Sequence, residues 1–582
     1  MLANRSLTGY PSIDKTHFKN TSFFERHPLI PSISISNAID YMFCLKGQTP
    51  AIDCLELHVN HREFKEDAII LSKAFLCLDV KPGEIICVSM PNFYQAVVAF
   101  KAANRIGAVI TFLNPLASDE ELKKYLTVYH SRLLINFDKD LEYNRVLKDG
   151  TSLEYIITLK KEHINSRFLP VSQEANIQNT PFLSYHDLAH VAKEWSGHEK
   201  TYFSGKQEAL ILYTSGSTGE PKSMVFTNEN ILSTLFYYKN TTHPEKVTDD
   251  NRRWMCVVPF MYPYGFAMSV LVSLLGGYEA ILAPDIGPDN VAKYYNKQPY
   301  LIFGSPAFLE LTKRNLPPDA DLSSLKIFIS GGDFLSPSQS ESGRQFFKEH
   351  HADVDICNGS GNGELLGCCT TALSTPIRPE TVGRLVVGPE YIILDPDTNE
   401  EVRYGEPGVL CTMGKHVFKG YYKNKELTEA TMISYKGKLF FKTGNYGSLD
   451  TDRYFTMIGR ASRFYINNSL NKVYCELVQS VVNQIDIVEA CAVVPMPDQE
   501  ALFISKAFVV LKTGISASEE TKDYIMQKAR EPYINPVTGE LVSLKDYEAP
   551  GSITFLQSLP RNENSDKIDY RKLEEMAKEN SI

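Results

Sequence analysis

The segment YTSGSTGEPKS, residues 213–223, contains the residue types that a binding site for phosphate groups needs. Six small or hydroxyl-bearing residues follow one another, and a lysine comes three positions later. The backbone amides of such a loop, its hydroxyls and the lysine can all donate to an anion. The six residues and the lysine are Thr214, Ser215, Gly216, Ser217, Thr218, Gly219 and Lys222. The segment therefore predicts an anion-binding loop.

The residues of this loop argue against two other interpretations. The P-loop of nucleotide hydrolases has a glycine, four residues, and then Gly-Lys followed by Ser or Thr. Here Pro221 stands where the second glycine is needed, and proline has neither an N–H nor the freedom in φ that a glycine has. A polar turn without a ligand is the other alternative, but the lysine after six small residues favours a site for an anion.

The run from Tyr213 to Lys222 resembles the signature loop of the adenylate-forming superfamily, and the chain as a whole is most similar to its acyl-CoA synthetases. Nonribosomal-peptide adenylation domains and luciferases belong to the same superfamily. The resemblance implies that the loop closes over the β- and γ-phosphates of ATP. It also implies the reaction: a small carboxylic acid is activated to acyl-AMP with release of pyrophosphate, and the acyl group then passes to a thiol, that of CoA.

Further segments resemble the superfamily pattern in the same order along the chain. VPFMYPYGF (258–266) resembles the lining of the acid pocket, LKIFISGGDFL (325–335) the turn that packs against adenine, and CNGSGNGELLG (357–367) the segment whose glutamate helps to hold Mg²⁺. The acid pocket implied in this way contains Tyr262, Tyr264, Gly265, Ser305, Gly331 and Gly361. The implied nucleotide contacts are Gly331, Gly332, Asp333, Asn358, Gly359, Ser360, Gly361, Asn362 and Gly363. A dinucleotide-binding Gly-x-Gly is the alternative for residues 359–363, but the spacing does not match that motif.

The same resemblance assigns the remaining site residues. Asn445 in FFKTGNYGSLD takes the place of an aspartate that binds both ribose hydroxyls, and Arg460 takes that of a ribose or hinge contact. Lys567 in LPRNENSDKIDYRKL matches the catalytic lysine. Glu364, with Thr214, is expected to hold Mg²⁺ and to take part in catalysis with Lys567. ATP, Mg²⁺ and CoA are thus the expected ligands.

The departures from the superfamily pattern include Ser360, Gly363, Asn445, Ser469 and Asp566. A neutral amide binds a ribose hydroxyl less strongly than a carboxylate does, because charge-assisted hydrogen bonds are the stronger ones. The departures lie mostly in the C-terminal half, so adenylation is better supported than thioester formation. Two alternatives stay open: loading of the acyl group onto the phosphopantetheine of an acyl or peptidyl carrier protein, and a degenerate, non-catalytic binder of adenylates or acyl groups.

These residues must be positioned by alternating strands and helices. Residues 84–91, 108–114 and 208–214 have the apolar pattern of buried strands, and the period of residues 94–107 is that of a helix. Ser118 and Glu121 form a candidate capping box for the next helix. Such alternation predicts an α/β fold with mainly parallel sheets.

The pattern changes near residue 380, where short apolar runs are separated by turn residues. We therefore expect a large N-terminal domain of layered α/β subdomains, residues 1–459, that includes a small barrel-like β subdomain at about 380–458. A small α+β domain, residues 460–582, would follow and carry Lys567, and the resemblance implies that it is mobile.

Composition restricts the class of protein. The chain has 582 residues, of which 43% are hydrophobic and 22% charged, with a formal net charge of −10, as in a soluble globular protein. Lysine and arginine are scattered, so a nucleic-acid partner is not expected. The eleven cysteines show no Cys-x-x-Cys spacing, which favours reduced buried thiols over zinc. Neither a secretory signal nor an integral membrane segment is evident, and we expect a cytoplasmic protein.

Overall fold

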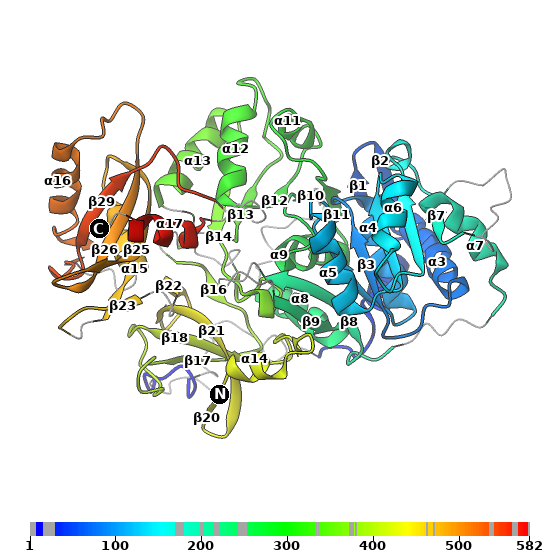
Figure 1. Ribbon diagram of the computed structural model, residues 1–582, viewed down its shortest axis with the longest axis horizontal. Helices are drawn as coiled ribbons and strands as arrows, with labels where there is room; N and C mark the ends of the chain where they lie inside the picture. Colours follow the sequence, from blue (N-terminus) through cyan, green and yellow to red (C-terminus); the bar gives the residue numbers. More distant parts are fainter. Residues whose placement is uncertain are drawn as a thin grey trace.

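The protein folds into two large, mainly parallel sheets with helices on their faces, an antiparallel sheet beside them, and a small C-terminal α+β part (Figure 1). The computed structural model describes residues 7–14, 29–168, 180–197, 203–214, 222–241, 253–332, 335, 337–371, 377–378, 381–460, 464–469, 472–534, 541–561 and 568–579. The predicted α/β class with a small α+β C-terminal part is confirmed.

The first sheet has seven strands, and all of its neighbouring strands are parallel except the β1–β2 pair. Its strands, in spatial order, are β14 (Asp355–Asn358), β13 (Ile327–Ser330), β12 (Leu301–Gly304), β10 (Arg253–Cys256), β11 (Glu279–Leu282), β1 (Pro50–Cys54) and β2 (Leu57–Asn60). Parallel strands end at the same edge of a sheet, so the segments that follow β12, β13 and β14 lie next to one another.

The second sheet has eight strands, of which β9 and β19 run antiparallel to their neighbours. In spatial order they are β19 (Gly420–Tyr421), β9 (Lys222–Thr227), β8 (Glu208–Thr214), β4 (Val109–Phe112), β3 (Ile85–Ser89), β5 (Leu133–Phe137), β6 (Tyr155–Leu159) and β7 (Phe182–Ser184). The strands predicted at 84–91, 108–114 and 208–214 are confirmed as β3, β4 and β8.

Alternate residues of the strands face different cores. On β10, Trp254 and Cys256 belong to a cluster that contains side chains of both large sheets, whereas Met255 packs on the opposite face. Helices that contribute to the cluster shared by the two sheets include α2 (Ile35–Lys46), α3 (His61–Cys77), α4 (Tyr94–Arg105), α7 (Leu188–Glu194), α8 (Asn228–Thr241), η5 (Phe266–Leu271) and α10 (Val272–Gly276).

The outer faces of the two sheets are covered by other helices. These are α5 (Asp119–Tyr129) and α6 (Leu141–Lys148) on the second sheet, and α11 (Val291–Tyr295), α12 (Pro306–Asn315) and α13 (Pro337–Glu349) on the first. Helix α4 confirms the helix predicted at 94–107, although it ends at Arg105. Helix α5 begins where predicted, because the hydroxyl of Ser118 accepts the backbone N–H of Glu121.

Residues after 380 form an antiparallel sheet, as predicted for a β-rich subdomain. Its strands are β17 (Glu390–Leu394), β18 (Gly408–Met413), β20 (Met432–Tyr435), β21 (Lys438–Leu449) and β22 (Phe455–Arg460), with α14 (Lys425–Ala430) before β20. One part of the predicted subdomain departs from it: β19 pairs with β9 of the second large sheet. One side of β9 pairs with β8 and the other pairs with β19. Without β19, the backbone groups on that other side of β9 would be unpaired.

The C-terminal part has its own sheet, seen on the left in Figure 1. This sheet consists of β25 (Val488–Asp498), β26 (Leu502–Leu511) and β29 (Pro550–Phe555). The other elements of this part are β23 (Phe464–Ile466), β24 (Lys472–Tyr474), α15 (Cys475–Val482), α16 (Glu519–Lys528), β27 (Tyr533–Ile534), β28 (Leu541–Val542) and α17 (Tyr570–Glu579). Helices α15 and α16 pack on one face of this sheet, and α17 packs on the other. Tyr474 stacks on Tyr446 of β21 with ring centroids 4.5 Å apart, so the part contacts the antiparallel sheet. The domain division at 459/460 stays a prediction.

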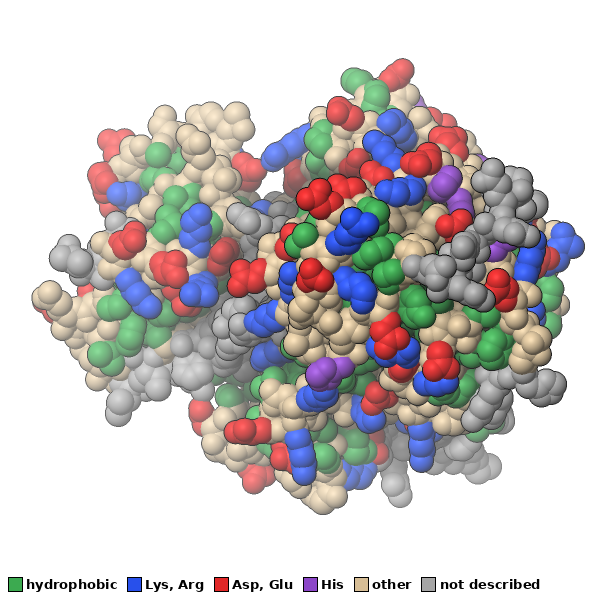
Figure 2. All heavy atoms as spheres, turned by 45° about the vertical axis from the view of Figure 1, so that its right-hand side comes forward, with side chains coloured by type: hydrophobic (Ala, Val, Ile, Leu, Met, Phe, Trp, Pro, Cys, Tyr) green, Lys and Arg blue, Asp and Glu red, His purple; other side chains and the backbone are tan. Residues whose placement is uncertain are grey.

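The cysteines, the apolarity of the helices and the surface charge were also subjects of the sequence predictions. All eleven cysteines are free thiols, and nine of them are buried, whereas Cys44 is exposed. Within the described residues, no helix is both long and apolar enough to cross a membrane. Figure 2 shows acidic and basic side chains interspersed over one face of the molecule.

Candidate functional site

The two ends of the glycine-rich loop are fixed by a β-hairpin. Strand β8 ends at Thr214 and β9 begins at Lys222, and these two residues are direct partners in the antiparallel register. The hydroxyl of Tyr129 donates to the hydroxyl of Ser223 at 2.7 Å, and this bond connects the start of β9 to the end of α5. The hairpin therefore determines where the loop leaves the second sheet.

Glu364 lies in a short 3₁₀ helix, η6 (Gly363–Leu365), and is held by the segment that contains β19. The backbone N–H of Phe418 donates to the carbonyl of Glu364 at 2.9 Å. The hydroxyl of Tyr421 donates to Glu364 Oε1. Burial, together with the neighbouring Glu364 carboxylate, raises the pKa of Tyr421, so its hydroxyl stays neutral and acts as a donor.

Lys222 approaches the same tyrosine from the loop side. Its Nζ lies 5.9 Å from the centroid of the Tyr421 ring, within the range of a cation–π contact. Lys222 and Glu364 were both predicted site residues, and Tyr421 touches both. The structure thus brings a cation and a carboxylate to one tyrosine, at the point where the glycine-rich loop rejoins the sheet.

The turns after β12, β13 and β14 form a second part of the predicted site. The N–H of Gly331 donates to the carbonyl of Gly304 at 3.1 Å, and the N–H of Gly359 donates to that of Ser330 at 2.9 Å. Ser305 is the N-cap of α12, because its hydroxyl accepts the N–H of Phe308 at 3.2 Å. The predicted residues Ser305, Gly331, Gly332, Asn358 and Gly359 therefore share one edge of the first sheet.

Tyr264 packs against this edge. Its hydroxyl donates to the carbonyl of Ile329 at 2.9 Å. A Cβ atom on Gly331 would lie 2.9 Å from Cζ of Tyr264, so the ring needs a glycine at residue 331. Tyr262 is half-buried, and burial raises its pKa to about 12. Gly265 is close-packed as well, since its Cβ would lie 2.2 Å from the carbonyl oxygen of Pro259.

Residues 358–361 run along the same edge. The side-chain amide of Asn358 donates to the carbonyl of Leu335 at 3.2 Å, and the N–H of Ser360 donates to Oγ1 of Thr370 at 3.0 Å. A Cβ atom on Gly361 would lie 2.0 Å from the carbonyl carbon of Gly367, so only glycine fits there. These contacts fix the path of the backbone that leads to Glu364.

Two predicted nucleotide residues donate to the carbonyl of Thr443, and a third is bonded to one of them. The side-chain amide of Asn362 donates to this oxygen at 2.6 Å, and Nη1 of Arg460 donates to it at 3.2 Å. The side-chain amide of Asn445 donates to Oδ1 of Asn362 at 3.3 Å. Asn445 is only 1% exposed, and within the described residues no donor reaches its Oδ1. One buried acceptor is thus left at the position where a ribose contact is predicted.

Several predicted residues lie outside the described part of the chain. These are Ser215, Gly216, Ser217, Thr218, Gly219, Asp333 and Lys567, and of Thr214 only the backbone is described. Residues on both sides of Lys567 are described: Arg561 and Ile568 form an isolated antiparallel bridge. The role of Lys567 stays a prediction.

Tyr421 and Thr443 belong to the site but were not predicted from the sequence. Tyr421 follows a glycine in a strand of two residues, which is too short for any periodic signal. Thr443 contributes a backbone carbonyl, and no residue type is needed for that. For Tyr421, the one signal in the sequence was the pair of tyrosines, Tyr421 and Tyr422, directly after Gly420.

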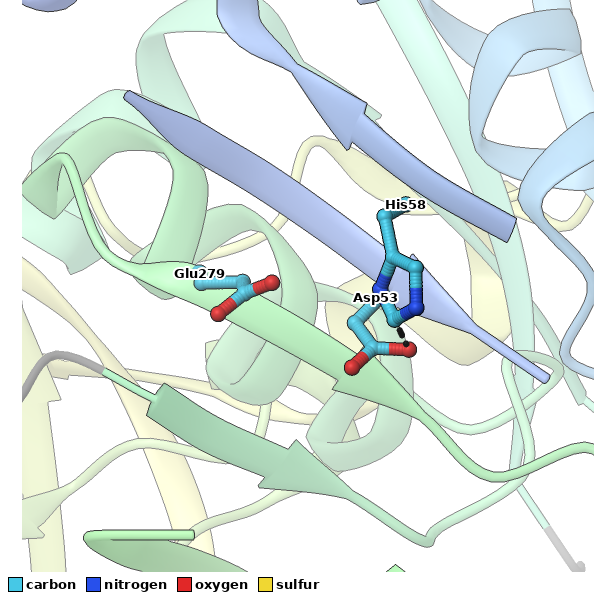
Figure 3. Close-up of side chains that lie close together, drawn as sticks. All are labelled: Asp53, His58 and Glu279. Atoms are coloured by element: carbon cyan, nitrogen blue, oxygen red, sulfur yellow. Dashed lines mark ion pairs between the residues drawn. The ribbon is translucent and has the colours of Figure 1, made fainter. Parts of the chain in front are cut away.

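A second cluster of charged groups lies at β1, β2 and β11. Figure 3 shows His58 beside Asp53, with Glu279 on the neighbouring strand. Nη2 of Arg253 lies 2.6 Å from Asp53 Oδ2, and Nζ of Lys297 lies 2.5 Å from Asp53 Oδ1. Arg253 Nε also lies 2.7 Å from Glu279. Two cations already compensate these carboxylates, so the cluster is an ion-pair network between strands.

Comparisons with known proteins agree with this architecture. Residues 46–422 match the family described as AMP-binding enzyme, and residues 477–565 match its C-terminal domain family. The chain is 25% identical to a probable CoA ligase of Humulus lupulus, over 83% of this chain and 82% of the relative. It is 26% identical to the long-chain-fatty-acid–CoA ligase of Bacillus subtilis, over 89% and 90% of the two chains.

Solved structures show the same fold at lower sequence identity. The anthranilate CoA ligase AuaEII in complex with anthranoyl-AMP matches with a TM-score of 0.77 at 20% identity, over 95% of this chain and 98% of that one. ATP-bound MatB from Rhodopseudomonas palustris matches with a TM-score of 0.75 at 20% identity, over 94% and 100%. The predicted arrangement, a large α/β part with a barrel-like subdomain followed by a small α+β part, is confirmed.

Proposed function

Because the chain belongs to the adenylate-forming family of AMP-binding enzymes, we propose that it activates a carboxylic acid with ATP and transfers the acyl group to CoA. The observation that carries this proposal is the meeting of Lys222, Tyr421 and Glu364 where the glycine-rich loop rejoins the sheet. Curated relatives with names of CoA ligases support the same reaction.

The first step joins two anions. A carboxylate oxygen attacks the α-phosphorus of ATP, the bond from that phosphorus to the bridging oxygen breaks, and pyrophosphate leaves. Fixed positive charge is needed to overcome the repulsion and the charge that develops on the phosphates. Lys222 supplies one such charge beside the loop, and Lys567 is proposed to supply another between the carboxylate and the α-phosphate.

The residues around Glu364 fit a magnesium ion. Oε1 of Glu364 accepts a hydrogen bond from the Tyr421 hydroxyl. Within the described part of the chain, Oε2 of Glu364 takes part in no hydrogen bond or ion pair. Magnesium in nucleotide sites is held by one or two carboxylates together with phosphate oxygens. Glu364 would hold the ion, with the Thr214 hydroxyl as a second protein ligand. When bound, the ion would neutralise charge on the phosphates.

In the second step a thiolate attacks the acyl carbon, the bond from that carbon to the phosphate oxygen breaks, and AMP leaves. The acid is proposed to be apolar, because tyrosines line the predicted pocket. Tyr264 fixes one wall through its bond to the carbonyl of Ile329, and Tyr262 lies on the turn before it. The loading of a carrier protein differs from this reaction only in the thiol that accepts the acyl group.

The test measures pyrophosphate release from ATP over a panel of short-, medium- and long-chain fatty acids and ring-containing acids. The accepted acid is then supplied with CoA or with a holo carrier protein, and AMP release is measured. We expect pyrophosphate release with an apolar acid and AMP release with CoA. If no acid on the panel supports turnover, the chain is a binder without ligase activity. If only the carrier protein releases AMP, the thiol has been assigned wrongly.

The Asn445 position gives a prediction about ATP affinity. We expect Asn445→Asp to lower the KM for ATP about fivefold with little change in kcat, because a charge-assisted bond to a ribose hydroxyl is about 1 kcal/mol stronger than a neutral one. Initial rates at saturating acid measure this effect. Asn445→Ala is the matched control and should raise the KM. A higher KM in Asn445→Asp would contradict a ribose contact at this residue.

A further inference from the structure

Tyr421 lies where three separate segments of the chain meet. It belongs to β19, it touches the carboxylate of η6, and it faces the lysine that opens β9. The proposed reaction needs both of these charged groups, but it assigns no task to the tyrosine. The contacts of Tyr421 therefore raise the question of what the side chain does.

The backbone and the ring of Tyr421 are both held in place. Tyr421 pairs with Met224 in the antiparallel register of β19 and β9. Its N–H donates to Oγ1 of Thr428 at 2.9 Å. Its ring makes an edge contact with the ring of Phe418, with centroids 4.9 Å apart. A side chain fixed in this way can impose an orientation on its neighbours.

The carboxylate of Glu364 receives its orientation from this segment. The N–H of Phe418 holds the carbonyl of Glu364, and the hydroxyl of Tyr421 holds Oε1. With both its backbone and one carboxylate oxygen fixed, the other oxygen has a defined direction. Groups that orient a metal-binding carboxylate through a hydrogen bond typically affect metal affinity or activity about 10- to 100-fold.

The ring of Tyr421 contacts the ammonium group of Lys222. Nζ of Lys222 lies over it at 5.9 Å, and Lys222 is only two residues from Met224, the β-pairing partner of Tyr421. A ring face near an ammonium group stabilises it by a modest amount and limits where its long side chain points. One tyrosine thus constrains both the cation of the loop and the carboxylate of η6.

We propose that Tyr421 is a positioning residue, whose hydroxyl orients Glu364 toward a divalent metal and whose ring holds Lys222 toward the nucleotide phosphates. This inference rests on the proposed function, since it takes from there that Glu364 holds the metal and that Lys222 contacts ATP. It adds a residue to the site that acts only through these two.

The test separates the hydroxyl from the ring. Mn²⁺ is titrated into the full-length protein with a non-hydrolysable ATP analogue bound, and the dissociation constant of the metal is measured directly. We expect Tyr421→Phe to weaken Mn²⁺ binding about tenfold, because it removes only the hydroxyl. The affinity of the same variant for the metal-free analogue should stay at the wild-type value, because the ring is retained. Tyr422→Phe is the matched control, and it should change neither constant.

Tyr421→Leu then removes the ring as well. We expect Tyr421→Leu, unlike Tyr421→Phe, to lose about threefold in affinity for the metal-free analogue, the size of an exposed cation–π contact. Equal Mn²⁺ affinity in wild type and Tyr421→Phe would overturn the positioning of Glu364 and leave the proposed ligase activity intact. Equal metal-free affinity in Tyr421→Phe and Tyr421→Leu would overturn the role of the ring. A wild-type protein that binds no metal with the nucleotide would overturn this inference and the metal site of the proposed function together.

Discussion

Lys567→Ala is expected to slow the formation of acyl-AMP by on the order of 10²- to 10³-fold, the cost of removing one fixed donor from developing negative charge. The lysine is proposed to bridge the attacking carboxylate and the α-phosphate, where the charge is greatest in the transition state. Its ammonium has no proposed task once acyl-AMP exists. Transfer from supplied acyl-AMP to CoA should therefore stay within about threefold of wild type.

The two half-reactions make this prediction specific. Pyrophosphate release measures the first, and AMP release from added acyl-AMP measures the second. Lys572→Ala is a suitable control, because Lys572 is an exposed lysine five residues away on α17. It should change either rate by no more than about twofold, as is usual for surface substitutions. Equal losses in both half-reactions would mean that Lys567 is needed for the fold and is not specific to adenylation.

Local patterns predicted the scaffold of the site well. Strand β3 and helix α4 could be predicted because most of their residues are apolar and follow the period of a strand or a helix. Resemblance identified Glu364 and Lys222, since motifs of unusual composition surround them. Both side chains contact Tyr421, because β19 pairs with β9 and the Tyr421 hydroxyl donates to Glu364.

The contacts between distant segments could not be predicted from the sequence. Tyr421 is 57 residues from Glu364, and Asn445 is 83 residues from Asn362. No period connects such pairs, and either asparagine alone is compatible with an ordinary polar surface residue. The two asparagines are hydrogen-bonded because β21 of the antiparallel sheet places Asn445 next to Asn362, which lies in the segment after β14.

The neutral residue at 445 has a physical reason that only the structure supplies. Asn445 is buried and donates to Asn362, whose own amide is bonded to the carbonyl of Thr443. This arrangement needs a donor at residue 445. A carboxylate there would face the oxygen of Asn362 and would be a buried charge, which is costly without a partner. The amide therefore stabilises the unliganded site and still leaves one acceptor for the nucleotide.

Glu364→Gln is the second change for which we expect a large effect, a loss of pyrophosphate release on the order of 10²-fold or more. Glutamine keeps the shape of the side chain and can still accept the Tyr421 hydroxyl, so the local fold should be retained. It loses the negative charge that favours a divalent cation over water. The rate should then no longer saturate at millimolar Mg²⁺, and a higher Mg²⁺ concentration should recover part of it.

The magnesium dependence distinguishes this loss from general damage to the protein. Glu426→Gln is the matched control, because Glu426 is exposed on α14, five residues beyond Tyr421, and its side chain forms no hydrogen bond or ion pair with a described residue. It should leave both the rate and the Mg²⁺ dependence at wild-type values. A Glu364→Gln protein that is slow at every Mg²⁺ concentration but has an unchanged Mg²⁺ midpoint would contradict metal binding at Glu364. In that case the carboxylate would serve Lys222 and Tyr421 alone, and the cation would be held by the phosphates and water.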